Sequence, residues 1–402
     1  MKRLLGALVV VLAPAGSLLA GSAGIAPCNQ RLERVLDSLQ VIDFSVPVQT
    51  SESAPLAARM AFYKIPGVGI AVINNFAVEC VEGAGHLKAG DVASVDEESV
   101  FQTGSVSKFV TAILVLHFVD RGMLDLDADV NRHLVSWQIP DTRSTSGNQV
   151  TLRQLLSHQA GIPAQPQLED SASLLQILRG EKPATNPPAV PDTIPGSRWN
   201  YSNIGYAVIQ LLLEDLTGKP MSQLAEEIVF EPLGMSSSSF SYPLREDLRS
   251  HEAMPHATDG SPRIPEQSGP VRAPGGLLST PRDMAKLVTA VMSAANGKNT
   301  PVMSPGAARL MLAKQVDVPP EALGLPLGMG LGVFLDSSTD EVCFLHPGHN
   351  SPGTTFVFVA YPALGKGAVI GANGNLGDRL YLEILASLAM EYGWPSGQPF
   401  KP

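Results

Sequence analysis

The fold of this chain is decided by the segment Ser105-Val106-Ser107-Lys108-Phe109-Val110-Thr111-Ala112-Ile113-Leu114-Val115-Leu116-His117-Phe118-Val119. From Lys108 onward the segment is almost wholly apolar and Gly122 follows it, which predicts a buried helix ended by a glycine. An ammonium group is costly to bury without a partner, so Lys108 at the head of this helix indicates a specific purpose. Ser105 stands three residues before Lys108, and side chains at that spacing share one face of a helix. The two side chains are therefore expected to meet.

The pairing of Ser105 with Lys108 is that of a nucleophile with its base. A serine hydroxyl is a weak nucleophile until a neighbouring base accepts its proton, and burial can lower the pKa of a lysine enough for it to serve. These two residues form the only Ser-x-x-Lys in the chain. Ser107 competes as the nucleophile, but it adjoins Lys108 and points elsewhere on the helix. A lysine that reaches solvent from the helix end is the non-catalytic alternative.

Strand patterns lie on both sides of this helix in the sequence. Residues 67–73 and 76–81 are β-rich and flank Asn74-Asn75, which predicts an antiparallel hairpin. The stretch from 123 to 265 has helical or proline-rich segments without strand alternation. Further strands are predicted at 330–334, 342–345, 355–360 and 367–370, and further helices at 31–39, 281–291 and 380–390.

These patterns predict an α/β (α+β) fold in which one antiparallel sheet, built from both ends of the chain, is flanked by helices. Residues 27–122 and 266–402 are expected to form the sheet domain, and residues 123–265 an inserted helical domain. With 402 residues, 44% hydrophobic and 16% charged, the chain can bury large cores. Its net charge of −10 argues against nucleic acid as a partner.

The first 26 residues have the order of a secretory signal peptide. Met1-Lys2-Arg3 is basic, residues 4–12 are apolar, and small residues follow from 13 to 26. A short membrane anchor is the alternative, but a proline and small residues interrupt the run before it reaches the roughly 20 apolar residues of a span. No later segment is long and apolar enough to cross a bilayer. We therefore expect an exported protein, periplasmic or secreted.

The cysteines and histidines give no metal site. Cys28, Cys80 and Cys343 allow at most one disulfide and cannot form a metal cluster by themselves. Cys28 with Cys80 is a conceivable pair in an oxidising compartment, but the sequence leaves the pairing open. His346 and His349 could be read as metal ligands, yet neither helical spacing nor a nearby carboxylate supports that reading. The sequence predicts neither a metal nor a cofactor.

Two further polar motifs follow later in the sequence. Tyr201-Ser202-Asn203 stands just before an apolar helix predicted at 204–216, and either of its last two residues could simply cap that helix. His346-Pro347-Gly348-His349-Asn350 follows a predicted strand. His158 stands near the end of another predicted helix, where we expect it to make a structural hydrogen bond.

A Ser-x-x-Lys, a Tyr-x-Asn and a basic residue-x-Gly after a late strand, in that order, form a specific set. With these motifs the sequence resembles the serine β-lactamase and penicillin-binding-protein superfamily, and within it the branch of class C β-lactamases, D,D-peptidases and esterases. The resemblance covers residues 55–390. Four further segments look like that branch: Pro66-Gly67-Val68-Gly69-Ile70-Ala71-Val72, Leu155-Leu156-Ser157-His158-Gln159-Ala160-Gly161-Ile162, Pro232-Leu233-Gly234-Met235 and Gly275-Gly276-Leu277-Leu278-Ser279-Thr280.

The resemblance implies acyl transfer. Ser105 would attack a carbonyl group, Lys108 and Tyr201 would share the general-base and proton-shuttle work, and water would release the acyl group. Asn203 would hold Lys108 and the amide side chain of the substrate. The backbone N–H groups of Ser105 and His349 would form the oxyanion hole.

The third motif departs from the β-lactamases of the superfamily, which carry Lys-Thr-Gly where this chain has His346-Pro347-Gly348. A lysine there supplies a fixed positive charge for a substrate carboxylate. A histidine of ordinary pKa is mostly neutral at pH 7 and gains charge as the pH falls toward 6. His346 and Gly348 are thus expected beside the substrate, and efficient β-lactam hydrolysis is the activity least expected.

The predicted partner is therefore a small molecule or a cell-wall peptide. The predicted activity is that of a serine hydrolase acting on an ester, a D-amino peptide or amide, or a lactam. A different hydrolase fold would carry Gly-x-Ser-x-Gly, which the chain lacks. The alternative function is a non-hydrolytic or very slow penicillin-binding or sensor protein that uses the same cleft.

Overall fold

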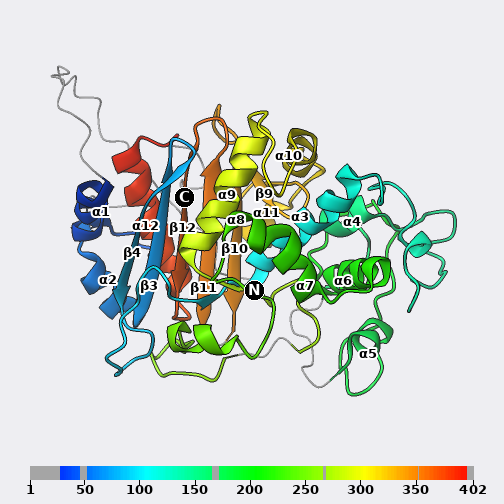
Figure 1. Cartoon of the computed structure of the whole chain (residues 1–402), viewed down its shortest axis with the longest axis horizontal. Helices are drawn as coiled ribbons and strands as arrows, with labels where there is room; N and C mark the ends of the chain where they lie inside the picture. The colour runs from blue at the N-terminus through cyan, green and yellow to red at the C-terminus, as the bar shows by residue number, and fades with distance from the viewer. Residues whose placement is uncertain (1–27, 46–51, 165–171, 266–268, 352, 396–402) are drawn as a thin grey trace.

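The computed structural model describes residues 28–45, 52–164, 172–265, 269–351 and 353–395, so the predicted signal peptide at 1–26 lies outside it. An eight-stranded antiparallel sheet has the order β4-β3-β12-β11-β10-β9-β8-β7 (Figure 1). Strands from both ends of the sequence lie side by side in this sheet, which confirms the predicted fold class. In sheet order the strands are Ala77–Gly85, Gly67–Asn74, Lys366–Ala372, Thr354–Tyr361, Cys343–Asn350, Phe334–Asp336, Gly328–Met329 and Val316–Asp317. Two short antiparallel pairs stand apart from it: β1 (Leu39–Gln40) with β2 (Ser53–Ala54), and β5 (Phe101–Gln102) with β6 (Leu278–Ser279).

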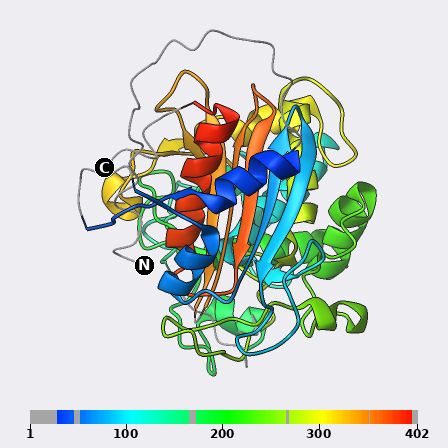
Figure 2. The same cartoon turned by 90° about the vertical axis from the view of Figure 1, so that its left-hand side faces the viewer.

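Helices cover both faces of the sheet, and Figure 2 shows α1 and α12 in front of the strands on one of them, with α1 crossing the strands. The helices on that face are α1 (Cys28–Asp37), α2 (Leu56–Tyr63) and α12 (Gly377–Tyr392). The opposite face packs on α9 (Pro281–Ala295), with α3 (Ser107–Asp120) and α10 (Pro305–Leu312) in the same core. The helix α9 begins as predicted, because Thr280 caps it by accepting the Asp283 N–H and Pro281 opens it.

The central strand β11 shows how the two faces are filled. Phe356 and Phe358 belong to the core under α9 and α3, whereas Val357 and Val359 belong to the core under α12. Successive side chains of a strand point to opposite faces, so a strand covered on both faces is apolar on both. All eight residues of β11 are accordingly buried.

Among the described residues between 123 and 265, the regular elements are helices joined by turns and loops, and no strand falls among them. The helix α6 contacts α3, α4 and α5 beside the sheet (Figure 1). One apolar core joins α6 and α3 to α9 and the sheet, and the division into two domains stays a prediction. The helices of this range are η2 (Val130–Arg132), α4 (Leu152–Leu156), α5 (Leu174–Arg179), α6 (Asn203–Thr217), α7 (Met221–Ala225), η3 (Glu226–Phe230), α8 (Glu231–Leu233) and η4 (Glu246–His251), and α11 (Pro320–Leu323) follows later.

The predicted hairpin is present, with its turn one residue later than expected. β3 and β4 pair antiparallel, and Asn74 pairs with Ala77. The turn residues are Asn75 and Phe76, with φ of 51° and 59°. Two-residue hairpin turns with positive φ at both positions match the twist of the flanking strands. The Phe76 ring packs against Gly365, where a Cβ would lie only 2.4 Å from the ring.

Two predicted strands differ in length from the observed ones. The pattern at 330–334 gives only the first residue of β9, because residues 331–333 form a bend with Gly332 at positive φ. The strand β10 runs on to Asn350 instead of ending at residue 345. Pro347 does not interrupt it, because residues 346–350 pair with β11 alone and a proline is tolerated at a sheet edge.

The two cysteines whose side chains the structure describes differ in oxidation state. Cys80 is disulfide-bonded, whereas Cys343 is a free thiol whose pKa is raised by burial. The side chain of Cys28 lies outside the described part of the structure. Among the described residues, no helix is both long and apolar enough to span a membrane, and no three His, Cys, Asp or Glu side chains gather as metal ligands.

A buried ion pair joins α2 to α12. The Arg59 guanidinium donates to both carboxylate oxygens of Glu383, at 2.7 and 2.8 Å. Glu383 is fully buried and also accepts from the Tyr63 hydroxyl and the Ile42 N–H, at 2.9 and 3.1 Å. Breaking such a pair leaves an uncompensated charge in the interior.

Arg59→Met is therefore expected to lower the free energy of unfolding by about 3 kcal/mol. Urea denaturation followed by circular dichroism measures the change. The matched control is Arg34→Met, because Arg34 pairs with Glu391 at a solvent-exposed position, where an ion pair contributes less than about 1 kcal/mol. Equal losses in the two variants would contradict this account of the buried pair.

Candidate active site

Ser105 and Lys108 meet at the start of α3, as their spacing predicts. The short helix η1 (Gly104–Val106) leads into α3 and carries Ser105. Lys108 Nζ donates to Ser105 Oγ at 3.1 Å and to the carbonyl oxygen of Pro274 at 2.7 Å. Lys108 is fully buried, so the alternative of a lysine reaching solvent is wrong.

Burial sets the protonation of Lys108. It lowers the pKa of the amine well below its ordinary value, because a charged ammonium loses its hydration in the interior. Its nitrogen lies 4.7 Å from the centre of the Tyr201 ring and 5.5 Å from that of Tyr206. An uncharged amine beside a serine hydroxyl can accept the proton of that hydroxyl.

Tyr201 completes the contacts of the serine. Burial raises the pKa of the Tyr201 phenol, and the Ser105 side chain beside it lowers that pKa by less. Ser202 caps α6 by accepting the Gly205 N–H at 3.0 Å. Asn203 is the first residue of α6 and is half-buried there. The cap is thus Ser202, which leaves Tyr201 and Asn203 for other roles.

His158 makes the structural hydrogen bond that we expected of it. Its Nδ1 accepts the Ser202 N–H at 3.1 Å, and its carbonyl oxygen accepts the Asn200 N–H at 2.7 Å. Its ring lies 4.3 Å from the Tyr201 ring, centre to centre. Burial lowers the pKa of His158 well below its ordinary value, so the ring is neutral. His158 therefore fixes the segment that carries Tyr201.

The open edge of β10 lies against the Ser105 segment. A Cβ on Gly348 would lie 1.9 Å from the Thr103 carbonyl oxygen, and a Cβ on Gly104 would lie 2.7 Å from the His349 nitrogen. Gly104 also has φ of 53°, a conformation that favours glycine. These two glycines let the backbones of Ser105 and His349 approach each other. The predicted oxyanion donors are thus brought together, and their role stays a prediction.

His346 is buried in β10, and its electrostatics differ from the expectation. Its Nδ1 lies 2.8 Å from the Pro347 carbonyl oxygen, and its ring packs 5.1 Å from that of Phe334. Burial, together with nearby Lys108, lowers the pKa of His346 to about 3. The expectation that this imidazole gains charge toward pH 6 is therefore wrong, because desolvation disfavours the charged ring.

The side chain of His349 points elsewhere than that of His346. It is exposed, and its Nε2 lies 3.0 Å from Asn375 Oδ1. Residues an odd number of positions apart in a strand face opposite sides, and accordingly His346 is in the interior and His349 is at the surface. The sequence patterns did not predict that the Pro274 carbonyl oxygen accepts a hydrogen bond from Lys108. Gly275 and Gly276, just after Pro274, belong to one of the segments that resemble the family.

Comparison with known proteins adds the family relationship. A family model described as Beta-lactamase matches residues 33–390. Penicillin-binding protein 4 of Amycolatopsis lactamdurans is 28% identical over 342 residues, which are 82% of this chain and 86% of that protein. Unguisins hydrolase ungD of Aspergillus violaceofuscus is 26% identical over 279 residues, 62% of this chain but only 46% of that hydrolase.

Two solved structures share the fold. The octameric penicillin-binding protein homologue from Pyrococcus abyssi has a TM-score of 0.68 at 24% identity, covering 86% of this chain and 76% of that one. The penicillin-binding protein from Bacillus halodurans has a TM-score of 0.66 at 22% identity, covering 83% of this chain and 98% of that one. At these identities the likeness extends to the fold alone.

Proposed function

The chain belongs to the Beta-lactamase family, and from this premise we propose that it hydrolyses ester or amide bonds through an acyl-enzyme on Ser105. The observation that carries the proposal is the 3.1 Å contact of Ser105 Oγ with the fully buried Lys108 amine. The family has a serine hydrolase fold, and two relatives bear the names of a penicillin-binding protein and a hydrolase.

In the proposed first step, Ser105 Oγ bonds to the substrate carbonyl carbon. The serine proton passes to Lys108 or, through Tyr201, to the leaving group, and the carbonyl oxygen takes the negative charge. The N–H groups of Ser105 and His349 stabilise that oxygen. The bond to the leaving group then breaks, and the leaving group departs with the proton that Ser105 lost. Water attacks the acyl-enzyme with its proton taken by the same pair, the bond from the acyl carbon to Ser105 Oγ breaks, and that proton returns to Ser105 Oγ.

The neutral His346 narrows the substrate class. Since β10 places no positive charge at this position, a lactam carboxylate directed there gains no ion pair. We therefore place esters and amides ahead of β-lactams as substrates. Asn203, on α6, is proposed to hold the amide group of the substrate. The disulfide at Cys80 supports the proposed export, because disulfides persist in oxidising compartments.

Treating the protein with a fluorophosphonate is expected to add one label, at Ser105. Mass spectrometry of the digested protein locates it, and Ser105→Ala is the control that should remain unlabelled. A label on Ser107 or Ser202 would contradict the assignment of the nucleophile. A label on Ser105 without measurable turnover of esters, amides or lactams would favour the non-hydrolytic sensor.

The ratio of kcat/KM for a cephalosporin to kcat/KM for a neutral ester is expected to change less than about twofold between pH 7.5 and pH 6. A pKa of about 3 keeps the His346 imidazole neutral at every pH above that value, so no positive charge appears over this range. An imidazole with a pKa of about 6.5 would gain charge several-fold between these pH values. A ratio that rises several-fold toward pH 6 and is flattened by His346→Gln would contradict the low pKa.

A further inference from the structure

The last five residues of β10 have a partner strand on one side only. Residues 346–350 pair with β11, whereas β9 pairs only with residues 343–345. This end of β10 carries the His349 N–H that the proposed mechanism uses. Among the described residues, no backbone hydrogen bond joins residues 346–350 to residues 102–105. The place of the His349 N–H beside the serine segment therefore depends on β11 and on side-chain contacts.

The segment that leads to Ser105 is fixed by β6. Gln102 pairs with Leu278 in the ladder of β5 with β6. The Thr103 N–H and hydroxyl both donate to the Leu277 carbonyl oxygen, at 3.0 and 3.1 Å. Both Gln102 and Thr103 are buried. This segment is thus a fixed reference against which the end of β10 can be held.

Each predicted oxyanion donor lies beside a glycine of the other segment. A Cβ on Gly348 would lie 3.2 Å from the Ser105 nitrogen. A Cβ on Gly104 would lie 2.7 Å from the His349 nitrogen and 3.1 Å from Asn350 Oδ1. The two backbones pack with no side chain between them. A small shift at the end of β10 therefore changes the spacing of the two N–H groups directly.

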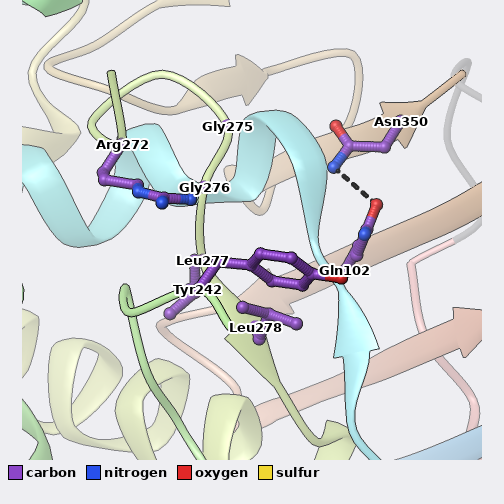
Figure 3. Close-up of a pocket in the computed structure, with 8 residues that line it drawn as sticks. All are labelled: Gln102, Tyr242, Arg272, Gly275, Gly276, Leu277, Leu278 and Asn350. Carbon is purple, nitrogen blue, oxygen red and sulfur yellow. Dashed lines mark hydrogen bonds between the residues drawn. The ribbon is translucent and has the colours of Figure 1, made fainter. Parts of the chain in front are cut away.

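One hydrogen bond between side chains spans this contact. Asn350, the last residue of β10, donates from Nδ2 to Gln102 Oε1 at 3.1 Å. Figure 3 shows the two carboxamide groups pointing toward one another, one from β10 and one from β5, in the wall of a small pocket. Gln102 stands three residues before Ser105. Asn350 directly follows His349. The hydrogen bond thus joins the two segments just outside the two donors.

We propose that Gln102 and Asn350 are positioning residues, whose hydrogen bond keeps the two oxyanion donors at a working distance from each other. Donors stabilise a developing oxyanion only where they already lie close to the position of its charge. A displaced donor therefore lowers the rate although every reacting group is still present. Neither carboxamide takes part in the proposed proton transfers. The inference rests on the proposed acyl-enzyme at Ser105.

Gln102→Met and Asn350→Leu test the proposal, because each nearly keeps the size of the side chain and removes the hydrogen bond. In either variant kcat/KM for 4-nitrophenyl butyrate is expected to fall about tenfold, which is part of the about 10²- to 10³-fold cost of losing a whole oxyanion donor. The double variant should lose about as much as the worse single variant, because the one bond they share is already gone. Losses that multiply in the double variant would contradict a role for this bond.

Propylboronic acid gives a second readout, specific to the oxyanion hole. Its boron accepts Ser105 Oγ while the serine proton passes to the base, and the tetrahedral adduct places an oxygen where the oxyanion forms. Such an adduct imitates the transition state, so its inhibition constant should rise about tenfold, in parallel with the loss of kcat/KM. An unchanged inhibition constant in variants with a reduced kcat/KM would overturn the proposal.

Asn131→Leu is the matched control for the loss of a half-buried carboxamide. Asn131 lies in η2, outside the site, and its side chain exchanges two hydrogen bonds of 2.9 Å with the Ile139 backbone. This variant should lose stability but keep kcat/KM and the inhibition constant within about threefold of wild type. If Gln102→Met does not fold, Asn350→Leu decides alone, because Asn350 is only half-buried.

Two further outcomes separate this proposal from the proposed function. If wild type hydrolyses the ester through Ser105 and the folded Asn350→Leu variant keeps kcat/KM within about threefold of it, the positioning proposal alone is overturned. If wild type hydrolyses no ester or amide in a Ser105-dependent way, both proposals are overturned.

Discussion

Ser105→Ala is expected to lower kcat/KM for the hydrolysis of a nitrophenyl ester by about 10⁴-fold. The variant lacks the oxygen that would form the acyl-enzyme, so the remaining groups can act only on an attacking water. Lys108 and Tyr201 cannot compensate, because groups that act as one unit lose most of their effect when any member is removed. Steady-state kinetics on the ester, on a D-Ala-D-Ala peptide and on a cephalosporin measures the loss for each bond type.

Ser107→Ala is the matched control for that experiment. Ser107 Oγ donates to the Gly104 carbonyl oxygen at 2.6 Å and accepts the Leu277 N–H at 3.0 Å. Removing it leaves a buried N–H without its partner and costs about 1 to 3 kcal/mol of stability. The folded variant should keep its activity within about tenfold of wild type. The reverse pattern, an active Ser105→Ala and an inactive Ser107→Ala, would reassign the nucleophile.

The local part of the site could be predicted from the sequence because it depends on helix geometry. Ser105, in η1, and Lys108, in the first turn of α3, are three residues apart where η1 runs directly into α3, and that spacing alone brings their side chains together. The central strands β3, β11 and β12 could be predicted for a similar reason, since each is an apolar run in a sheet covered on both faces. The predicted strand at 342–345 ended too early, because nothing local shows that Pro347 falls where β10 pairs with β11 alone.

The remaining features of the site come from contacts distant in sequence. The carbonyl that holds Lys108 belongs to Pro274, 166 residues later. The approach of β10 to the serine depends on Gly348 meeting Thr103, which no periodicity reveals. The pKa of His346 depends on its burial beside Lys108. The residue type alone therefore predicts a neutral imidazole at pH 7, but it wrongly predicts that the imidazole gains charge toward pH 6. Sequence patterns thus predicted that Ser105 and Lys108 meet, but they did not predict the electrostatic environment of His346.

Replacing Lys108 by Met is expected to lower kcat/KM for ester hydrolysis by about 10³-fold, and Tyr201→Phe by about 10²-fold or more. Both substitutions keep the buried volume and remove only the groups that carry the serine proton. If the two groups move one proton together, the double variant should lose far less than the product of the single losses. Losses that simply multiply would mean that the two residues act independently.

The pH dependence of the rate of ester hydrolysis is a second test of the role of Lys108. Because burial lowers the pKa of Lys108, the amine is neutral above that pKa, and the wild-type rate should fall as the pH drops through it. Lys108→Met should lose this acid limb together with the rate. The control is Tyr206→Phe, since Tyr206 is equally buried near Lys108 but donates its hydroxyl to the Leu156 carbonyl oxygen at 3.0 Å. It should keep both the rate, within about threefold, and the acid limb, because its hydroxyl is bound away from the serine.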